Sequence, residues 1–274
     1  MKTESAPTDT GSKNGRKPWL VAVGTGIRTV GQMTLESIVW LEAADKVLYV
    51  VADIIAEETV KRLNPRAESM IGLYAPGKHR LQSYGEMVDR ILTSVRAGLN
   101  TCVALYGHPG VFAYPAHESI RRARSEGFSA WMLPGISAED CLYADLGLDP
   151  ADSGCQSYEA THFMLNVPYI NPSSTLVLWQ VGVIGHSLYQ YSYHLSAMPM
   201  LLERLYRYYR PDHPVIVYEA AVLPGCEPVI KRIPLAALPA AGLSTSSTVC
   251  IPPAQPDPRM VDRLNVLYQD NRKL

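Results

Sequence analysis

Three short apolar runs in the first half of the chain each end at a glycine-bearing turn, and this feature constrains the fold most. The runs and their turns are residues 19–23 with Gly24-Thr-Gly26, residues 102–106 with Gly107-His-Pro-Gly110, and residues 128–133 with Leu133-Pro-Gly135. A buried parallel strand is a short unbroken apolar run, and glycine permits the tight turn after it. The pattern predicts a parallel sheet whose strand ends carry glycine-rich loops.

Apolar residues at helical spacing fill the segments between these runs. Helices are predicted at residues 34–44, 55–63, 80–97 and 116–126, with another buried strand at 47–51. In residues 80–97 the apolar positions recur every three or four residues, which is the period of an α-helix. Strands that alternate with helices form a parallel sheet covered on both faces, so the first half predicts an α/β domain.

The second half repeats this mixture less clearly. Its strongest strand candidates are residues 176–181, 215–219 and 247–251, with a helix at 198–209. A length of 274 residues suits two domains. We therefore expect the organisation of the chain to be a disordered leader at 1–17, α/β domains at 18–134 and 135–254, and a tail or short helix at 255–274.

Charge and composition exclude several classes of protein. The chain has 25 basic and 26 acidic side chains, which gives no basic footprint for a nucleic acid. Its best candidate membrane span, residues 47–56, is too short and contains Asp53. The five cysteines are scattered and no His/Cys cluster has metal-ligand spacing, so no metal is expected. The N-terminus lacks the apolar core of a signal peptide, and we expect a cytoplasmic protein without nucleic-acid or membrane partners.

The glycine loops match neither common nucleotide-binding motif. A dinucleotide fingerprint needs a third glycine where Thr29 stands, and no Gly-Lys-Ser/Thr triplet of a Walker loop occurs. Ligands of open α/β sheets bind at the carboxyl ends of the strands. The residues alone therefore indicate a small-molecule α/β enzyme, and they leave open that any single loop is merely a turn.

Taken together and in order, the loops resemble those of the tetrapyrrole-methylase superfamily. The first set of matching segments is Val23-Gly-Thr-Gly-Ile27, Leu105-Tyr-Gly-His-Pro-Gly-Val-Phe112 and Leu133-Pro-Gly-Ile-Ser-Ala-Glu139. Within the superfamily the chain is most similar to the methyltransferase domain of the borosin family. The segments that carry this closer resemblance are Gly31-Gln-Met-Thr34, Ser137-Ala-Glu-Asp-Cys141, Asp145-Leu-Gly-Leu-Asp-Pro150, Tyr158-Glu-Ala160, Gln180-Val-Gly182, Tyr218-Glu-Ala-Ala221 and Ser247-Thr248.

The resemblance covers residues 19–253 and implies a fold and an activity. It implies two α/β domains with a cleft for S-adenosylmethionine (SAM) between them. It also implies repeated methylation of backbone amide nitrogens in a ribosomally made precursor peptide, by a homodimer. The founding fungal members continue into a clasp and a C-terminal core peptide, whereas this sequence ends about twenty residues after Pro253. We therefore expect a separate precursor chain, bound as a heterotetramer.

Methylating an amide nitrogen requires an unusual set of catalytic groups. The nitrogen lone pair is delocalised into the carbonyl, so a site must accept the amide proton and stabilise charge on the oxygen. Tyr74, Arg80 and Tyr84 provide such groups, and the last two share a helix face. The resemblance implies that Arg80 holds a tyrosinate, while one tyrosine takes the amide proton and the other binds the carbonyl. Otherwise Tyr84 is a core aromatic and Arg80 a solvated first-turn residue.

The resemblance also implies which residues surround the cofactor. One wall is expected from Tyr106, His108, Val111 and Phe112, with Ser137 and Ala138 at a helix N-terminus. The other side is expected from Gln180, Tyr218, Ala220, Ser247 and Thr248. For His108 the alternative is a plain turn residue.

Three other functions compete with peptide methylation. A tetrapyrrole or other small-molecule methyltransferase of the same superfamily leaves the tyrosine–arginine–tyrosine trio without an obvious role. An RNA ribose methyltransferase would need a basic cleft, which the charge of −1 disfavours. A catalytically idle member that only binds the precursor would not need the trio. Tyr189, Tyr191 and Tyr193 suit a peptide-contacting stripe, an exposed loop or a dimer contact. The apolar and aromatic residues of 189–193 and 198–209 together suit a dimer interface.

Overall fold

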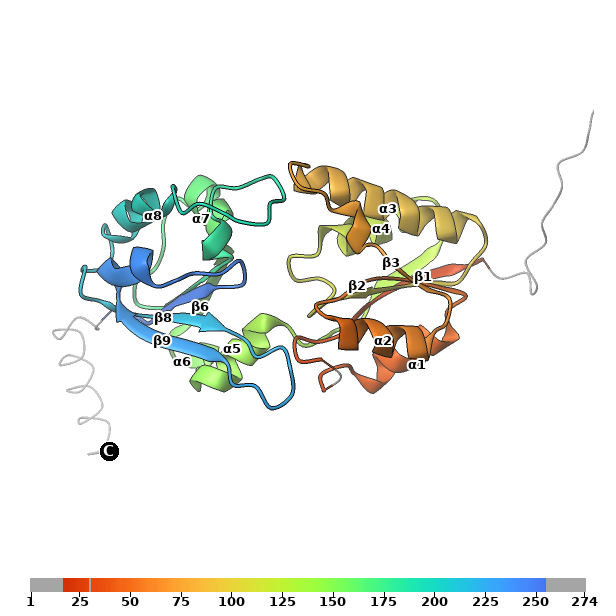
Figure 1. Ribbon diagram of the computed structural model, residues 1–274, viewed down its shortest axis with the longest axis horizontal. Helices are drawn as coiled ribbons and strands as arrows, with labels where there is room; N and C mark the ends of the chain where they lie inside the picture. Colours follow the sequence, from red (N-terminus) through yellow and green to blue (C-terminus); the bar gives the residue numbers. More distant parts are fainter. Residues whose placement is uncertain (1–16, 30, 255–274) are drawn as a thin grey trace, which may run out of the picture. The chain divides into compact units, whose positions relative to one another are not determined.

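The computed structural model describes residues 17–29 and 31–254, and divides the chain into two compact units. The first comprises Met1–Cys141 with Val222–Cys226, and the second Leu142–Ala221 with Glu227–Leu274 (Figure 1). The leader expected at 1–17 lies outside the described residues apart from Lys17, as does the tail expected at 255–274. The domain boundaries proposed from the sequence stay a prediction.

A five-stranded sheet forms the centre of the first unit, in the order β3-β2-β4-β1-β5. Its strands are β1 (Trp19–Gly24), β2 (Lys46–Val50), β3 (Ala67–Ser69), β4 (Thr101–Leu105) and β5 (Ser129–Met132). Every pair is parallel, as the alternation of strands and helices predicts. The sequence analysis misses β3 because three half-buried residues carry no detectable period.

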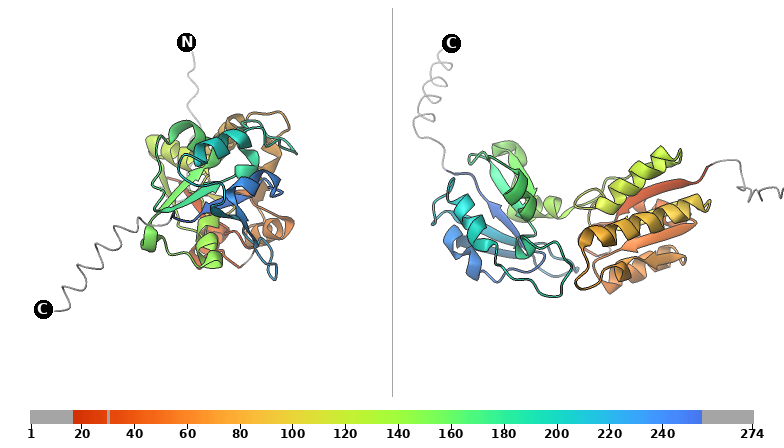
Figure 2. Two further views of the ribbon diagram at one scale, coloured as in Figure 1. Left: turned by 90° about the vertical axis from the view of Figure 1, so that its left-hand side faces the viewer. Right: turned by 90° about the horizontal axis from the view of Figure 1, so that it is seen from above.

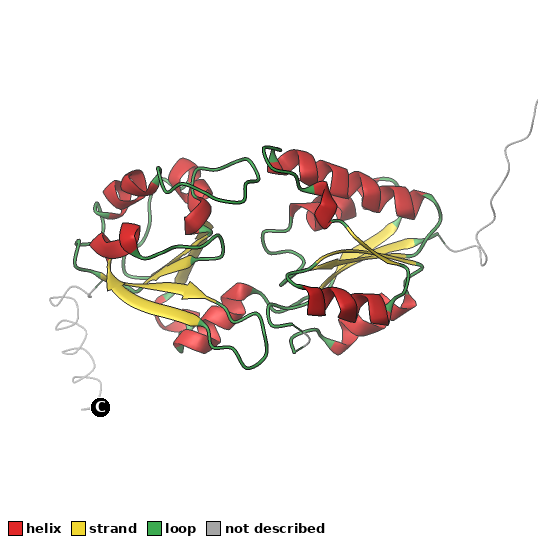
Figure 3. Ribbon diagram, in the orientation of Figure 1, coloured by secondary structure: helices red, strands yellow, loops and turns green. Residues whose placement is uncertain are grey.

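Helices cover both faces of this sheet (Figures 1 and 3). They are α1 (Leu35–Ala43) and α2 (Ile54–Leu63) on one face, and α3 (Arg80–Arg96) and α4 (Tyr114–Ser125) side by side on the other (Figure 2). All four predicted helices are confirmed. Thr34 caps α1 by accepting a hydrogen bond from the Ser37 amide at 3.1 Å, which satisfies a donor that the helix itself leaves free.

Two apolar layers hold the helices on the sheet. Met87, Ile91 and Val95 of α3 are buried against sheet residues such as Leu20 and Val103. On the opposite face the rings of Trp19, Trp40 and Trp131 pack with centroids 5.0 to 6.0 Å apart. Burying a large apolar side chain stabilises the fold by about 1.5–3 kcal/mol. These layers therefore hold the sheet and its helices together and fix the position of the sheet edge that carries the glycine loops.

The second unit has a mixed sheet in the order β6-β7-β10-β8-β9. Its strands are β6 (Cys155–Glu159), β7 (Thr175–Trp179), β8 (Pro214–Glu219), β9 (Val229–Pro234) and β10 (Thr248–Ile251). The β6–β7 pair is parallel and the other three pairs are antiparallel. The sequence analysis misses β6 and β9 because both are largely polar or exposed and show no buried face.

Helices α7 (Ala160–Asn166) and α8 (Met198–Leu205) and the 3-10 helix η3 (Leu235–Ala240) pack on the main core of this unit. Two further helices are α5 (Ala138–Leu146) and α6 (Pro150–Ser153). The helix predicted at 198–209 is too long, because α8 ends at Leu205 and gives way to turns before Pro211. Likewise β7 ends at Trp179, since Gln180 adopts a left-handed conformation with φ of 57°.

Among the described residues no helix combines the length and apolar character that a membrane crossing requires.

Candidate active site

Three glycine loops meet at the carboxyl edge of the first sheet. The Gly26 and Gly107 backbones exchange N–H···O bonds of 3.3 and 2.9 Å, so the loops after β1 and β4 are in direct contact. A Cβ at Gly24 would lie 2.2 Å from the Gly107 oxygen, which only glycine allows. Gly135 in the loop after β5 adjoins the same place, because its Cβ would lie 3.4 Å from the Gly24 Cα.

The Gln32 side chain shapes the loop after β1. Its Oε1 accepts hydrogen bonds from the backbone amides of Ile27 at 2.9 Å and Arg28 at 2.8 Å. These bonds give two loop amides a partner that no strand provides. Gln32 is therefore a loop-shaping residue that the sequence analysis does not single out, although it stands in the quoted Gly31-Gln-Met-Thr34 segment.

The loop after β4 exposes several predicted cofactor residues. Tyr106, Val111 and Phe112 are 40%, 38% and 52% exposed, although all three side chains are largely apolar. Phe112 has a φ of 53°. This left-handed conformation costs free energy in any residue that has a Cβ atom. Such strain collects at ligand-binding sites, where the surrounding structure imposes it.

His108 has a defined role in this loop, as its Nδ1 accepts a hydrogen bond from the Gly110 amide at 2.9 Å. The other polar group of Gly110, its carbonyl, lies 2.8 Å from Nε2 of His117 on α4. Together the two imidazoles fix the glycine backbone from both sides. His117 on α4 therefore helps to hold the loop.

Ser137 and Ala138 stand where α5 begins, as expected. Ser137 is buried, and its hydroxyl and amide both donate to Asp140 Oδ2 at 2.7 Å. The same hydroxyl oxygen accepts from the amides of Glu139 and Asp140 at 3.2 Å. These are the contacts of a helix N-cap, so the hydrogen bonds of the Ser137 hydroxyl are all made to residues of α5.

The expected catalytic tyrosines lie side by side. Tyr74 ends the 3-10 helix η1 (Ile71–Leu73), and Tyr84 lies in the second turn of α3. Their ring centroids are 6.2 Å apart and the rings are nearly perpendicular, at 88°. Both are half-buried and pack against the core at their apolar ring atoms. Arg80, also half-buried, is the first residue of α3, one turn before Tyr84.

Tyr114 extends this pair into a row of three aromatic rings. Its ring stacks on that of Tyr84, with centroids 6.2 Å apart and an angle of 29°. Tyr114 opens α4 directly after the loop that ends at Phe112, and 45% of it is exposed. The sequence analysis misses it because nothing in its spacing connects it with α3; only packing of α4 against α3 does.

The cofactor residues expected in the second unit gather at one edge of its sheet. Gln180 follows the end of β7, and Ser247 precedes the start of β10, which runs antiparallel to β7. The Val181 amide donates to the Ser247 carbonyl at 3.1 Å. Tyr218 pairs in register with Thr248, and Ala220 follows the end of the same strand, β8.

These residues differ in how accessible they are. Gln180 and Ala220 are half-buried, whereas Tyr218, Ser247 and Thr248 are at most 2% exposed. The Tyr218 hydroxyl donates to Asp145 Oδ2 at 2.7 Å, and the Ser247 hydroxyl to Glu219 Oε1 at 2.5 Å. The buried hydroxyls of Tyr218 and Ser247 therefore have partners within the unit, which leaves Gln180 and Ala220 as the accessible members of the group.

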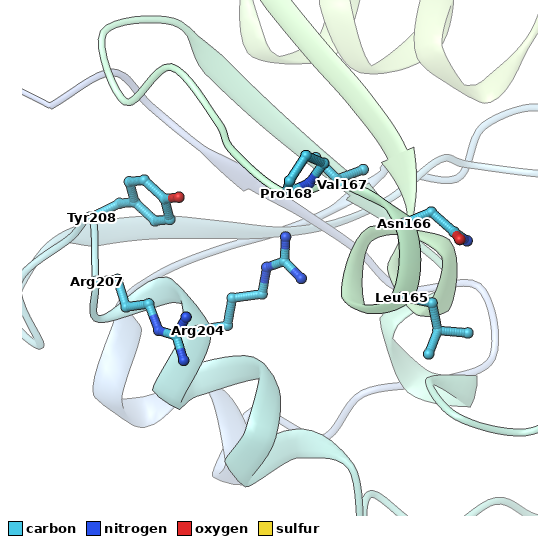
Figure 4. A pocket seen from close by; sticks show the side chains of 7 residues that line it. All are labelled: Leu165, Asn166, Val167, Pro168, Arg204, Arg207 and Tyr208. Atoms are coloured by element: carbon cyan, nitrogen blue, oxygen red, sulfur yellow. The ribbon is translucent and has the colours of Figure 1, made fainter.

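A cavity of about 300 Å³ elsewhere in the second unit contains none of the expected site residues. Its lining is Leu165, Asn166, Val167, Pro168, Arg204, Arg207 and Tyr208 (Figure 4). Arg204 Nη1 donates to the Met164 carbonyl at 2.9 Å, and its guanidinium lies 4.4 Å from the centroid of the Phe163 ring. Arg204 thus provides a hydrogen-bond donor to a carbonyl in the last turn of α7. Across the described part of the chain no His, Cys, Asp and Glu side chains group into a metal site.

The fold and these loops define an α/β protein with glycine-rich strand ends in its first unit and a mixed sheet in its second. The profile of the Tetrapyrrole (Corrin/Porphyrin) Methylases matches residues 20–238, most of the chain. The chain belongs to this methyltransferase family.

Curated fungal proteins are similar in sequence. A "methyltransferase/ribosomally synthesized type I borosin cyclic peptide precursor" of Coprinopsis marcescibilis is 41% identical over 254 residues, which cover 90% of this chain and 65% of the relative. The gymnopeptides precursor of Gymnopus fusipes is 43% identical, covering 92% and 62%. The omphalotin A precursor of Omphalotus olearius is 40% identical, covering 84% and 55%. The chain thus spans between about half and two thirds of these relatives.

Solved structures share the fold at low sequence identity. A uroporphyrin-III C-methyltransferase from Thermus thermophilus has a TM-score of 0.63 at 19% identity, covering 86% of this chain and 93% of that one. A cobalt precorrin-4 methyltransferase of cobalamin biosynthesis has a TM-score of 0.61 at 17% identity, covering 85% and 94%. The expected tetrapyrrole-methylase fold is therefore confirmed.

Proposed function

We propose that this chain methylates backbone amide nitrogens of a ribosomally made precursor peptide, with SAM as the methyl donor. The observation that carries the proposal is the perpendicular contact of Tyr74 and Tyr84, 6.2 Å between centroids, beside the helix that Arg80 begins. Two phenols and a guanidinium are the groups that an amide acceptor needs. Similarity to the borosin precursor proteins supports the same substrate.

The residues present fit SAM as the cofactor. Phe112 and Gln180 are the positive-φ residues other than glycine among those described, and both belong to the set expected around SAM. Backbone strain at both is the mark of a site built for a ligand. Tyr106, Val111 and Phe112 of the first unit would contact SAM, and bound SAM would supply an electrophilic methyl group. By the borosin resemblance, Gln180 of the second unit belongs to the same set of cofactor residues.

The reaction then depends on how the chain treats the acceptor amide. One of Tyr74 and Tyr84, as a phenolate stabilised by Arg80, accepts the amide proton, and the other donates a hydrogen bond to the amide carbonyl. The proton transfer places charge on the carbonyl oxygen, which that hydrogen bond stabilises. Burial, followed by the influence of Cys141 and Asp53, raises the pKa of Tyr106 to about 12, which disfavours its phenolate and therefore its use as the base.

Methyl transfer to a supplied precursor tests the proposal. The C-terminal precursor segment of the Gymnopus fusipes relative is the probe, offered with SAM as a separate polypeptide. We expect mass increments of one methylene per transfer, located on backbone nitrogens by fragmentation. Calorimetry should give one SAM site per chain. Tight nicotinamide-dinucleotide binding, or methylation of a tetrapyrrole carbon in place of the peptide, would contradict the proposal.

Variants of the trio test the assigned roles. Tyr74→Phe, Arg80→Ala and Tyr84→Phe should each slow single-turnover methylation by about 10²–10⁴-fold, since each removes a proton-transfer or charge-stabilising group. SAM affinity should stay nearly unchanged. Tyr169→Phe, at an 80% exposed position, is the matched control and should leave the rate intact. A near-normal rate for Tyr84→Phe would make Tyr84 a core aromatic.

Mass spectrometry tests whether the precursor is a separate chain. The names of the fungal relatives describe a methyltransferase and a precursor in one protein, whereas we expect this chain to act on a separate precursor. Intact mass spectrometry of the chain expressed alone, compared with the chain given the separate probe, distinguishes the two. Methylated residues within the chain itself would overturn this expectation.

We also propose that the enzyme is a homodimer that binds two precursor chains. Of the two segments expected to form its interface, residues 189–193 contain the 83% exposed Tyr191. The other gives less support than the sequence suggests, because Met198, Leu201 and Leu205 of α8 are buried in the core of their own unit. The proposal therefore relies on the tyrosine segment and on the borosin resemblance.

A further inference from the structure

The carbonyl of Leu73, directly before Tyr74, accepts two side-chain hydrogen bonds. Lys78 Nζ donates to it at 2.8 Å, and Ser83 Oγ at 3.0 Å. Ser83 is fully buried and is the neighbour of Tyr84 on α3. One backbone oxygen therefore connects the segment that ends at Tyr74 with the helix that carries Tyr84.

Lys78 is itself held in place. Its Nζ also pairs with Glu86 Oε2 on α3 at 2.5 Å, and its side chain is only 18% exposed. Glu86 Oε1 accepts a further hydrogen bond from Gln82, one turn earlier, at 3.3 Å. The pairing with Lys78 lowers the pKa of Glu86, so the carboxylate stays ionised under ordinary conditions. The Glu86 side chain is 39% exposed, so this pair is only partly shielded from water, and the second bond, to the Leu73 carbonyl, fixes the direction of the Lys78 side chain.

A tight turn brings Lys78 back toward Leu73. The Lys78 amide donates to the Ala75 carbonyl at 3.0 Å, and Gly77 has a φ of 77°. Pro76 and Gly77 thus occupy the two central positions of a turn that requires a positive φ at the second of them. The loop from Tyr74 to His79 is closed at its base by the Leu73 carbonyl and stiffened at its tip by this turn.

We propose that Lys78, anchored by Glu86 and assisted by Ser83, is a positioning residue that sets the place of Tyr74 relative to Tyr84. The inference rests on the proposed function, because the relative position of the two phenols matters only if both act on one amide. Misplacing a catalytic group by about 1 Å can slow a reaction 10²-fold. Lys78 acts through the Leu73 carbonyl and has no contact with the peptide in this scheme.

Hydrogen exchange tests the holding role without any substrate. Lys78→Met keeps the aliphatic length and removes the donors, so amide exchange of residues 71–79 should be about tenfold faster or more. Ser83→Ala should act in the same direction to a smaller extent, and Lys78→Arg should stay near wild type. Arg96→Met is the matched control, because it breaks the Arg96–Glu126 pair at the other end of α3. It should leave exchange of residues 71–79 unchanged.

Kinetics with the Gymnopus fusipes precursor probe test the consequence. Lys78→Met should lower kcat by about 10–100-fold while KM for the probe and the Kd of SAM stay within about twofold, since only the geometry of the phenols changes. Lys78→Arg should recover most of kcat. Arg96→Met should keep wild-type kcat even if it lowers Tm as much as Lys78→Met does, which separates positioning from general stability.

Several results would overturn the inference. They are unchanged exchange of residues 71–79 in Lys78→Met, faster exchange with unchanged kcat, or a loss confined to KM. A wild-type enzyme that methylates no backbone amide would defeat the proposed function alone. The exchange comparison of Lys78→Met with Arg96→Met would then still decide whether Lys78 holds the loop.

Discussion

At the scale of single residues, two of the candidate cofactor residues have backbone conformations that cost free energy. Phe112 and Gln180 both adopt left-handed backbone angles, with φ of 53° and 57°. This region costs a residue with a Cβ about 1–2 kcal/mol relative to ordinary helical angles. A glycine at either position would avoid this cost.

A pair of Gln180 variants separates the backbone from the side chain. Gln180→Gly and Gln180→Ala both remove the amide group and should weaken SAM binding equally. Gln180→Ala should be less stable than Gln180→Gly by about 1 kcal/mol, because only glycine accepts the positive φ freely. Urea unfolding and SAM calorimetry check both statements. Wild-type SAM affinity in both variants would remove Gln180 from the site.

Glu118 gives a pH-dependent prediction. Its carboxylate accepts hydrogen bonds from Arg121 and from Arg122, at 2.6 to 2.7 Å, which lower its pKa from 4.5 to about 2. A depressed carboxyl pKa stabilises the fold above the unfolded value and loses that contribution as pH falls through the folded one. The Tm difference between wild type and Glu118→Gln should be largest above pH 4.5 and shrink toward pH 2. A difference independent of pH would contradict this.

At the scale of elements, single buried polar groups connect helix ends to one another. Asn64, 2% exposed, caps the end of α2. Its Nδ2 donates to the carbonyls of Leu41 at 2.8 Å and Ala44 at 2.9 Å, at the end of α1. It thereby satisfies two carbonyls that α1 leaves without partners.

Removing that side chain should be costly. Asn64→Ala leaves the buried Leu41 carbonyl without its side-chain donor, whereas the Ala44 carbonyl keeps a hydrogen bond from Arg66 Nη2 at 3.1 Å. We therefore expect the free energy of unfolding to fall by about 1–3 kcal/mol. Asn166→Ala, at an exposed position at the end of α7, is the control and should change it by less than about 0.5 kcal/mol. Chemical denaturation of both variants gives the comparison. Equal stability of the two would mean that water replaces Asn64 without loss.

Two glycines of the first unit should respond in opposite ways to alanine. At Gly24 a Cβ would lie 2.2 Å from the Gly107 oxygen, so Gly24→Ala should push the loops after β1 and β4 apart and weaken SAM binding at least tenfold. At Gly85, within α3, no atom other than those of its chain neighbours and the nearby backbone of its own helix lies within 4 Å of the added Cβ. Gly85→Ala should raise stability by about 0.5–1 kcal/mol. Unchanged SAM affinity in Gly24→Ala would contradict the loop assignment.

At the scale of the whole molecule, the prediction concerns the oligomeric state of the enzyme. An enzyme that methylates many positions must hold an extended peptide without relying on one side-chain type. A second subunit would provide the additional main-chain contacts. We therefore expect a two-fold dimer that becomes a heterotetramer with two copies of the precursor.

Light scattering decides the assembly. The enzyme alone should scatter as a dimer, and addition of the separate precursor probe should raise the mass by two precursor chains. Tyr191→Asp, which places a charge on the exposed tyrosine segment, should weaken the dimer and lower methylation together. A monomer that stays fully active at high dilution would refute the dimer.

The sequence by itself determined the elements whose pattern is local. Apolar runs of five or six residues and helical spacing predict β1, β2, β4 and the four helices of the first unit, because burial imposes those periods directly. The spacing of Tyr74, Arg80 and Tyr84, with the borosin resemblance, singles out the candidate catalytic residues. Thr34 is likewise recognisable as a helix start from its neighbours alone, whereas Ser137 is expected at a helix start only through the resemblance.

Only the tertiary structure decided the contacts between distant segments. Stacking of Tyr114 on Tyr84 and the bond from Asn64 to the Leu41 carbonyl depend on which surfaces meet, which no local period encodes. The exposed strand β9 and the shortened α8 follow the same rule, since sheet pairing and core packing fix their limits. Local sequence thus specified which residues could act, and packing specified which of them lie together, because hydrophobic burial joins segments regardless of their distance along the chain.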